Sequence, residues 1–178
     1  MIHHLITGTE PFSCQPRIGG ASRHHAEPSS RLATSSAERW PVDLPSKPSL
    51  VSSCLLGLCT RYDGCAKPHN DCICLLERTL LIPVCPEQLG GLPTPRERST
   101  LIGDGHEILA GKGRVKSASG SDVTDHFIRG AHMTLKIAEL TGATSAILKA
   151  KSPSCGVSGI IGVAAALLQS AGITLIEY

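Results

Sequence analysis

The sequence contains three cysteines whose positions make them candidate metal ligands: Cys54, Cys85 and Cys155. Each lies at the end of a short apolar stretch or a few residues beyond it, and such stretches are typical of buried β-strands. A thiolate is a ligand for soft metals. If the fold brings the three strand ends together, the three thiols hold a metal centre. For Cys54 taken alone, a buried thiol in a turn is the competing interpretation.

A carboxylate accompanies the second of these cysteines. Glu87 lies two residues beyond Cys85, in a segment rich in proline and glycine. In such a rigid loop it would act as a general acid or base at a fixed distance from a bound metal. The plainer interpretation is an ordinary exposed glutamate in a turn.

Hydroxyl and ammonium groups surround the third cysteine. Ser152 and Ser154 precede Cys155, and Lys149 and Lys151 lie just before them. Positive charge favours a thiolate or a bound anion, and such a loop before a helix can equally bind a phosphate. The segment lacks the spacing of a P-loop, which argues against a nucleoside triphosphatase.

The elements that must position these residues alternate between short apolar strands and longer helical patterns. The expected strands are Leu50–Ser53, Leu80–Val84, Ser145–Leu148 and Ile173–Ile176, and the expected helices are Asn70–Arg78, Asp122–Leu140 and Gly159–Ala171. Ser121 or Asp122 is expected to cap the longest helix, and Gly142 to end it. Two further strands are expected around Glu107–Leu109 and Arg114–Val115, within a region of loops.

This alternation predicts an α/β fold of three layers, Rossmann-like, with a short parallel sheet flanked by helices. In such sheets, ligands bind just outside the carboxyl ends of the strands. The three cysteines are therefore expected at one edge of the sheet.

The bulk properties limit the possible functions. A chain of 178 residues is long enough for one α/β domain. A net charge of +2 does not by itself indicate a basic surface that binds nucleic acid. Residues 1–48 show no sustained period and are expected to be a disordered or weakly ordered extension, before a domain over 49–178. Neither a secretory signal nor a long apolar run is evident, so we expect a cytoplasmic protein with no membrane partner. In a reducing cytosol, cysteines are more often metal ligands or buried thiols than disulfides.

Four other cysteines, Cys59, Cys65, Cys72 and Cys74, crowd the segment after Cys54. Zinc favours four thiolates, but the spacing between these four cysteines does not match a pair of Cys-x-x-Cys motifs. A zinc site is the less favoured interpretation, and incidental or redox-active thiols are the more favoured one.

Several segments in order resemble the thiouracil desulfidase family, also known as domain of unknown function 523. They are Ser-x-Cys-Leu-Leu-Gly at 52–57, Arg-Tyr-Asp-Gly at 61–64, Val-Cys-Pro-Glu at 84–87 with Gly-Gly-Leu-Pro-Thr-Pro-Arg at 90–96, Asp-Val-Thr at 122–124, Ile-Leu-Lys at 147–149 and Ser-Pro-Ser-Cys-Gly at 152–156. The resemblance extends over residues 50–178.

The resemblance implies an enzyme with a 4Fe-4S cluster on Cys54, Cys85 and Cys155, whose fourth iron is open to sulfur. It implies that water replaces the sulfur of a thiolated pyrimidine, releasing hydrosulfide without net redox change. The matching catalytic groups are Glu87 and Ser152, with Ser154 as the alternative. The expected partner is a thiolated pyrimidine base or nucleotide, or a thiolated transfer RNA. Lys149 and Lys151 would balance cluster charge or bind a phosphate.

One departure from the family pattern lies beside Cys155. The family has a longer stretch after Gly156, whereas here Val157 to Ile160 lead into the expected helix. The alternative function is therefore an iron-sulfur or zinc-binding protein of the same fold whose catalysis is impaired. The sequence predicts no oligomeric state.

Overall fold

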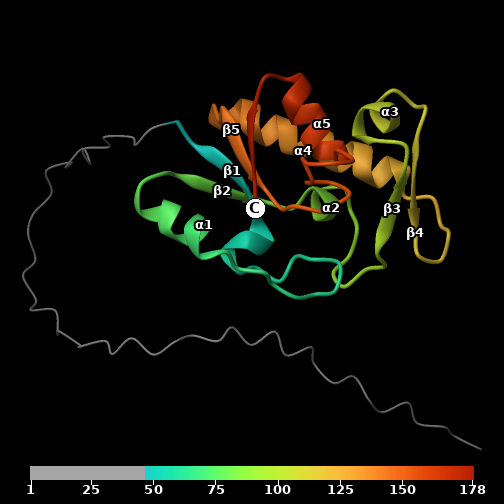
Figure 1. The fold of residues 1–178 in the computed structure, drawn as a ribbon, viewed down its shortest axis with the longest axis horizontal. Coiled ribbons are helices and arrows are strands. Elements are labelled where there is room, and N and C mark those ends of the chain that lie inside the picture. Colours follow the sequence, from blue (N-terminus) through green and yellow to red (C-terminus); the bar gives the residue numbers. More distant parts are fainter. Residues whose placement is uncertain (1–46) are drawn as a thin grey trace, which may run out of the picture.

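A computed structural model describes residues 47–178, so nearly all of the predicted N-terminal extension lies outside the described residues. The centre of the fold is a parallel sheet with the strand order β2-β1-β5-β6 (Figure 1). Its strands are β1 (Ser49–Ser52), β2 (Leu81–Val84), β5 (Ser145–Leu148) and β6 (Thr174–Glu177). Each strand lies within one or two residues of its expected position, and the predicted α/β fold with a parallel sheet is confirmed.

Layers on both faces of the sheet follow from the alternation of side chains along β1. Leu50 packs against Ala165 and Leu168, on the face covered by α4 (Thr124–Thr141) and α5 (Val163–Ser170). Val51 points to the other face, toward the 3-10 helix η1 (Ser53–Leu56) and α1 (Asn70–Cys74). A second 3-10 helix, η2 (Leu75–Glu77), continues α1, so the two together match the expected helix 70–78. The sheet is therefore the middle of three layers.

The long helix α4 begins two residues later than expected and ends at Gly142, which has a φ of 68° as a left-handed C-cap requires. Asp122 accepts hydrogen bonds from the amide of Thr124 (3.0 Å) and from its hydroxyl (2.5 Å). The Thr124 hydroxyl in turn accepts from the Val115 amide at 2.9 Å. The start of α4 is thereby tied to the neighbouring hairpin.

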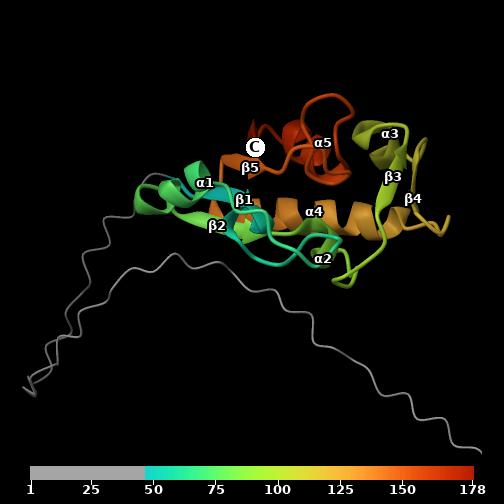
Figure 2. The same cartoon turned by 60° about the horizontal axis from the view of Figure 1, so that its bottom comes forward.

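Of the two strands expected in the middle of the chain, the one around Arg114–Val115 is confirmed and the one around Glu107–Leu109 is wrong. The segment expected as a strand at Glu107–Leu109 belongs to helix α3 (Gly105–Leu109), because Asp104 and Glu107 form a reciprocal capping box with both bonds at 2.9 Å. The partner of β4 (Arg114–Ser117) is instead β3 (Ser99–Ile102), in an antiparallel hairpin. Figures 1 and 2 show this hairpin and α1 at opposite ends of the described molecule.

Two helical boundaries bear on the cysteines. A short helix that was not expected, α2 (Pro86–Leu89), starts directly after Cys85, where proline suits the first helical turn. The last helix was expected from Gly159 but begins at Val163, so residues 157–162 form a loop after Cys155 and Gly156. Within residues 47–178, no helix is long and apolar enough to cross a bilayer.

The N-cap position of α4 is Val123, with no side-chain cap bond, so the expectation that Ser121 or Asp122 is the cap is wrong. The contacts of Asp122 with Thr124 nevertheless make a testable prediction. Hydrogen bonds from Thr124, with a further one from Lys116, lower the pKa of Asp122 to about 2 from an ordinary 3.8. A lowered pKa means that the carboxylate stabilises the fold above about pH 4 and that this contribution is lost as the pH falls toward 2. We expect Asp122→Ala to lower the urea midpoint at neutral pH, and the difference from wild type to narrow between pH 4 and pH 2. If the difference in urea midpoint between Asp122→Ala and wild type stays constant from pH 4 to pH 2, the proposed stabilisation by the ionised Asp122 carboxylate is contradicted.

Candidate active site

The three strand-end cysteines line one cavity of about 290 Å³ at the carboxyl edge of the sheet. The register explains their meeting, because Ser52 in β1 pairs with Val84 in β2, and Val51 pairs with Ile147 in β5. Cys54 and Cys155 are buried and Cys85 is half-buried. The sheet therefore delivers three thiols from distant parts of the chain to one place.

Each thiol is held by a different local structure. Cys54 lies in η1, and its carbonyl oxygen accepts from the amides of Gly57 (3.2 Å) and Lys67 (3.0 Å). Gly57 has a φ of 93°, a conformation that glycine adopts without strain. Cys85 is the N-cap residue of α2, and its Sγ lies 3.5 Å from the Thr60 carbonyl oxygen.

The loop of Cys155 is held by its own side chains and backbone. The Cys155 and Ser154 amides both donate to Ser152 Oγ, at 3.1 and 3.3 Å. Lys151 has a φ of 56°, left-handed backbone that is uncommon for a residue with a side chain. Strain of this kind persists where the surrounding structure dictates the conformation, as it does at many functional sites.

Burial favours the protonated thiol at Cys54 and Cys155 by raising the pKa of each. Desolvation raises the pKa of Cys155 to about 12. Burial also raises the pKa of Cys54, and the neighbouring Cys85 adds to this, while Lys149 and Arg61 oppose it. Thiolates at this edge therefore call for a metal to balance their charge.

The donor set of the cavity fits an iron-sulfur cluster better than a single ion. Among residues 47–178, no three His, Cys, Asp or Glu side chains lie close enough to hold one metal ion. The cavity that the three thiols help to line has room for on the order of ten water molecules. Three thiols around such a space are the ligands that an iron-sulfur cluster uses.

The four crowded cysteines do not form a zinc site in the described part of the chain. Within residues 47–178, no three of these side chains lie close enough together to hold a metal ion. Cys72 is fully buried in the cluster of Val51 and Leu55, whereas Cys65 and Cys74 are exposed. The structure therefore gives no support to the zinc interpretation.

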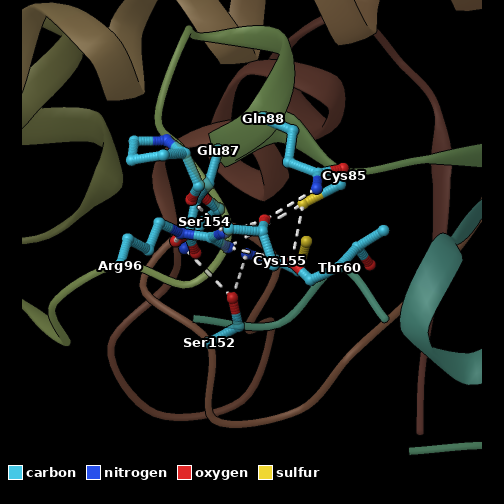
Figure 3. Close-up of polar contacts among 10 residues, drawn as sticks. Thr60, Cys85, Glu87, Gln88, Arg96, Ser152, Ser154 and Cys155 are labelled. Carbon is cyan, nitrogen blue, oxygen red and sulfur yellow. Dashed lines mark hydrogen bonds and ion pairs between the residues drawn. The ribbon is translucent and has the colours of Figure 1, made fainter. Parts of the chain in front are cut away.

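Glu87 lies in the cavity wall, where its carboxylate forms a buried ion pair. Arg96 Nε lies 2.7 Å from Glu87 Oε2. The Arg96 side chain is 5% exposed and the Glu87 side chain is 11% exposed. Figure 3 shows the pair beside Cys85 and Cys155. The interpretation of Glu87 as an exposed turn residue is wrong. Arg96 was not among the expected site residues, although it is the last residue of the Gly-Gly-Leu-Pro-Thr-Pro-Arg segment.

The two serines of the Cys155 loop lie differently. Ser152 lines the cavity, and its oxygen accepts the two amide bonds described above. Ser154 is 1% exposed and does not line the cavity. Its Oγ is buried with no hydrogen-bond partner among the described residues, while its carbonyl oxygen accepts from the amides of Ala164 and Ala165 at the start of α5. Ser154 thus serves the helix start, and Ser152 faces the cavity.

Cationic side chains dominate the cavity wall. Lys149 and Lys151 line it as expected, and the further lining cations are Arg61, Lys67, Arg96 and Arg98, against the single lining carboxylate of Glu87. Burial lowers the pKa of Lys149, whose Nζ donates to the Ala150 carbonyl at 2.8 Å. The guanidinium groups of Arg61 and Arg98 lie 5.8 and 5.7 Å from the centre of the Tyr62 ring. The wall therefore suits an anionic ligand.

Glu177, in β6, anchors the loop that follows Cys155. Its Oε1 accepts from the amides of Val157 (2.6 Å) and Ser158 (3.1 Å). Burial alone would raise the pKa of Glu177, but hydrogen bonds from Ser158 and Val157 outweigh burial and lower it. The loop after Cys155 is thus bound to the last strand by a carboxylate.

Comparisons with known proteins agree with this architecture. A family model described as 2-thiouracil desulfurase matches residues 50–177. The uncharacterized protein YbbK of Bacillus subtilis (strain 168) is 41% identical over 142 residues, which make up 72% of this chain and 93% of that protein. A solved structure titled as the 4Fe-4S-dependent thiouracil desulfidase TudS is similar at a TM-score of 0.64 and 36% identity, covering 74% of this chain and 91% of that one.

The anchor on the loop after Cys155 is testable by amide hydrogen exchange. Glu177→Ala removes the acceptor of two backbone amides, so we expect faster exchange at Val157 and Ser158. Glu139→Ala is a suitable control, since Glu139 forms only an exposed pair with Lys136 on α4. Unchanged protection at both amides in Glu177→Ala would contradict the role of this anchor.

Proposed function

This chain belongs to the 2-thiouracil desulfurase family, and from this premise we propose that it removes sulfur from a thiolated pyrimidine with the help of a 4Fe-4S cluster. The observation that supports the proposal most directly is the convergence of three thiols on one cavity. The solved relative that is similar in fold and sequence is itself a 4Fe-4S-dependent thiouracil desulfidase.

Cys54, Cys85 and Cys155 would hold the cluster, since they are the three thiols of the cavity wall. When bound through three protein ligands, a cluster supplies an iron with a free position, a Lewis acid that accepts sulfur. The cations of the wall offset the negative charge that three thiolates add. A cytoplasmic location is part of the same proposal, because thiols persist in a reducing compartment.

Glu87 is proposed to take the proton from the attacking water. Arg96 binds one carboxylate oxygen, Oε2, and the other oxygen accepts no hydrogen bond from the described residues. That second oxygen is available to a water molecule in the cavity. A carboxylate held in one orientation removes a proton more effectively than a freely rotating one.

Ser152 is proposed to donate a hydrogen bond to the substrate. A hydroxyl has one donor and two acceptor positions, and two amides already donate to Ser152 Oγ. Its proton is therefore free to point into the cavity, toward a ring oxygen or nitrogen. Ser154 was the alternative, but it is buried and does not line the cavity, so we assign this role to Ser152.

The overall reaction conserves atoms and electrons. The oxygen of water forms a bond to the ring carbon, the carbon–sulfur bond breaks, and the sulfur leaves as hydrosulfide. The proton that Glu87 accepts returns to the ring or to the departing sulfur, so nothing is oxidised or reduced.

The cationic wall favours a nucleotide over a free base. Lys151, Lys67 and Arg98 are exposed at the cavity and can meet a phosphate, while Lys149 lies deeper, near Cys54. A free base lacks the charge that these groups would bind. We therefore propose a thiolated pyrimidine nucleotide as the preferred substrate.

The ligand assignment predicts the outcome of three substitutions. In anaerobically reconstituted protein, Cys54→Ser, Cys85→Ser and Cys155→Ser should each lose bound iron and the broad visible absorption of an iron-sulfur cluster. The exposed Cys65→Ser and Cys74→Ser serve as controls and should retain both. Loss of iron in a control variant but not in Cys155→Ser would refute the site.

The proposed proton acceptor predicts a separate effect on rate. Glu87→Gln should bind iron as the wild type does, and release hydrosulfide from thiouracil or thiouridine monophosphate about 10²–10⁴ times more slowly. Comparing the two substrates also tests the phosphate preference, which should appear as a lower KM for the nucleotide. If the wild-type protein instead binds the cluster and releases no hydrosulfide from either substrate, that result would favour the alternative, an iron-sulfur protein whose catalysis is impaired.

A further inference from the structure

Arg96 holds the Glu87 carboxylate in the mechanism proposed above, and its guanidinium also makes several further contacts at the cavity. Nε donates to Glu87 Oε2, and Nη1 donates to the Pro93 carbonyl and the Thr94 hydroxyl, both at 3.1 Å. Nη2 donates to the Thr60 carbonyl at 3.1 Å and lies 3.9 Å from Cys85 Sγ. The dashed lines in Figure 3 mark these contacts around Glu87, Thr60 and Cys85. Every guanidinium nitrogen therefore has a partner.

The backbone fixes this side chain in the same place. The Arg96 amide donates to the Tyr62 carbonyl at 2.7 Å, joining the loop after Cys54 to the loop that carries Arg96. Cys85 Sγ contacts the same Thr60 carbonyl that accepts from Arg96. One guanidinium thus connects the segment after β1 to the segment after β2.

The chemistry of this arrangement requires an arginine rather than any cation. A buried charge is costly unless it is paired and its hydrogen bonds are made, and here a carboxylate and three neutral acceptors meet both needs. A guanidinium is a rigid fork that donates in several fixed directions at once. A lysine ammonium in its place would reach one of these groups and abandon the others.

We propose that Arg96 is a positioning residue that holds the Glu87 carboxylate and the Cys85 sulfur in one fixed relation by donating to both. The N–H toward sulfur also withdraws electron density from Cys85 when it is a cluster ligand, and such hydrogen bonds raise the reduction potential of iron-sulfur clusters. This inference rests on the proposed function, since it takes Cys85 as a ligand and Glu87 as the proton acceptor.

Arg96→Lys in the full-length, anaerobically reconstituted protein tests the inference. All three cysteines remain, so iron content should equal that of wild type. We expect the reduction potential of the cluster to shift to a more negative value, and kcat to fall about 10–100-fold with KM nearly unchanged. A merely structural arginine would change the urea midpoint without moving the potential.

Arg114→Lys is the matched control, because Arg114 also contacts backbone carbonyls and a carboxylate, that of Asp122, but lies in the distant hairpin. Its potential and kcat should equal those of wild type. An Arg96→Lys protein with the potential and kcat of wild type would overturn the inference. Wild-type protein that binds no iron would instead refute the proposed function.

A measurement on the wild type keeps the inference testable if Arg96→Lys does not fold. Arginine labelled with ¹⁵N in the guanidinium should produce a nitrogen hyperfine coupling in the spectrum of the reduced, paramagnetic cluster. The absence of any such coupling would overturn the proposed N–H contact to Cys85.

Discussion

The parallel pairing of β1 with both β2 and β5 is the constraint on which the site depends. Parallel strands end at the same edge, and the register of Ser52 with Val84 and of Val51 with Ile147 brings those ends to one level. β1 is buried at all four positions, so a shift of one residue would exchange Leu50 and Val51 between the two cores. Packing thus determines the register, and the register determines where the three thiols meet.

Groups that are unfavourable alone compensate one another at this edge. The thiols of Cys54 and Cys155 are buried and resist ionisation, which suits ligands whose charge a metal balances. Glu87 and Arg96 form a buried pair whose members would each be costly without the other. Burial and pairing therefore hold these groups in one arrangement at the sheet edge.

The segment from Lys149 to Ser158 is held in place by hydrogen bonds at both of its ends. Ser152 binds two amides of its own loop, and the Ala150 amide donates to the Tyr178 carbonyl at 2.7 Å. Glu177 binds the amides at the far end. Glu177 and Tyr178 thus hold the two sides of the loop that connects β5 to α5.

The sequence by itself determined the elements whose signals are local. The buried run of β5, the apolar face of α4 with Gly142 at its end, and the three cysteines at strand ends were all predictable, because periodicity and strand ends lie in neighbouring residues. Helix α3 was missed although its capping box is local, since its apolar residues suggested a strand. Only the tertiary structure decided that Arg96 binds Glu87 and contacts Cys85, that Ser152 rather than Ser154 faces the cavity, and that Lys67 and Arg98 join its wall. These relations depend on how separate loops fold over the sheet edge, which no local pattern encodes.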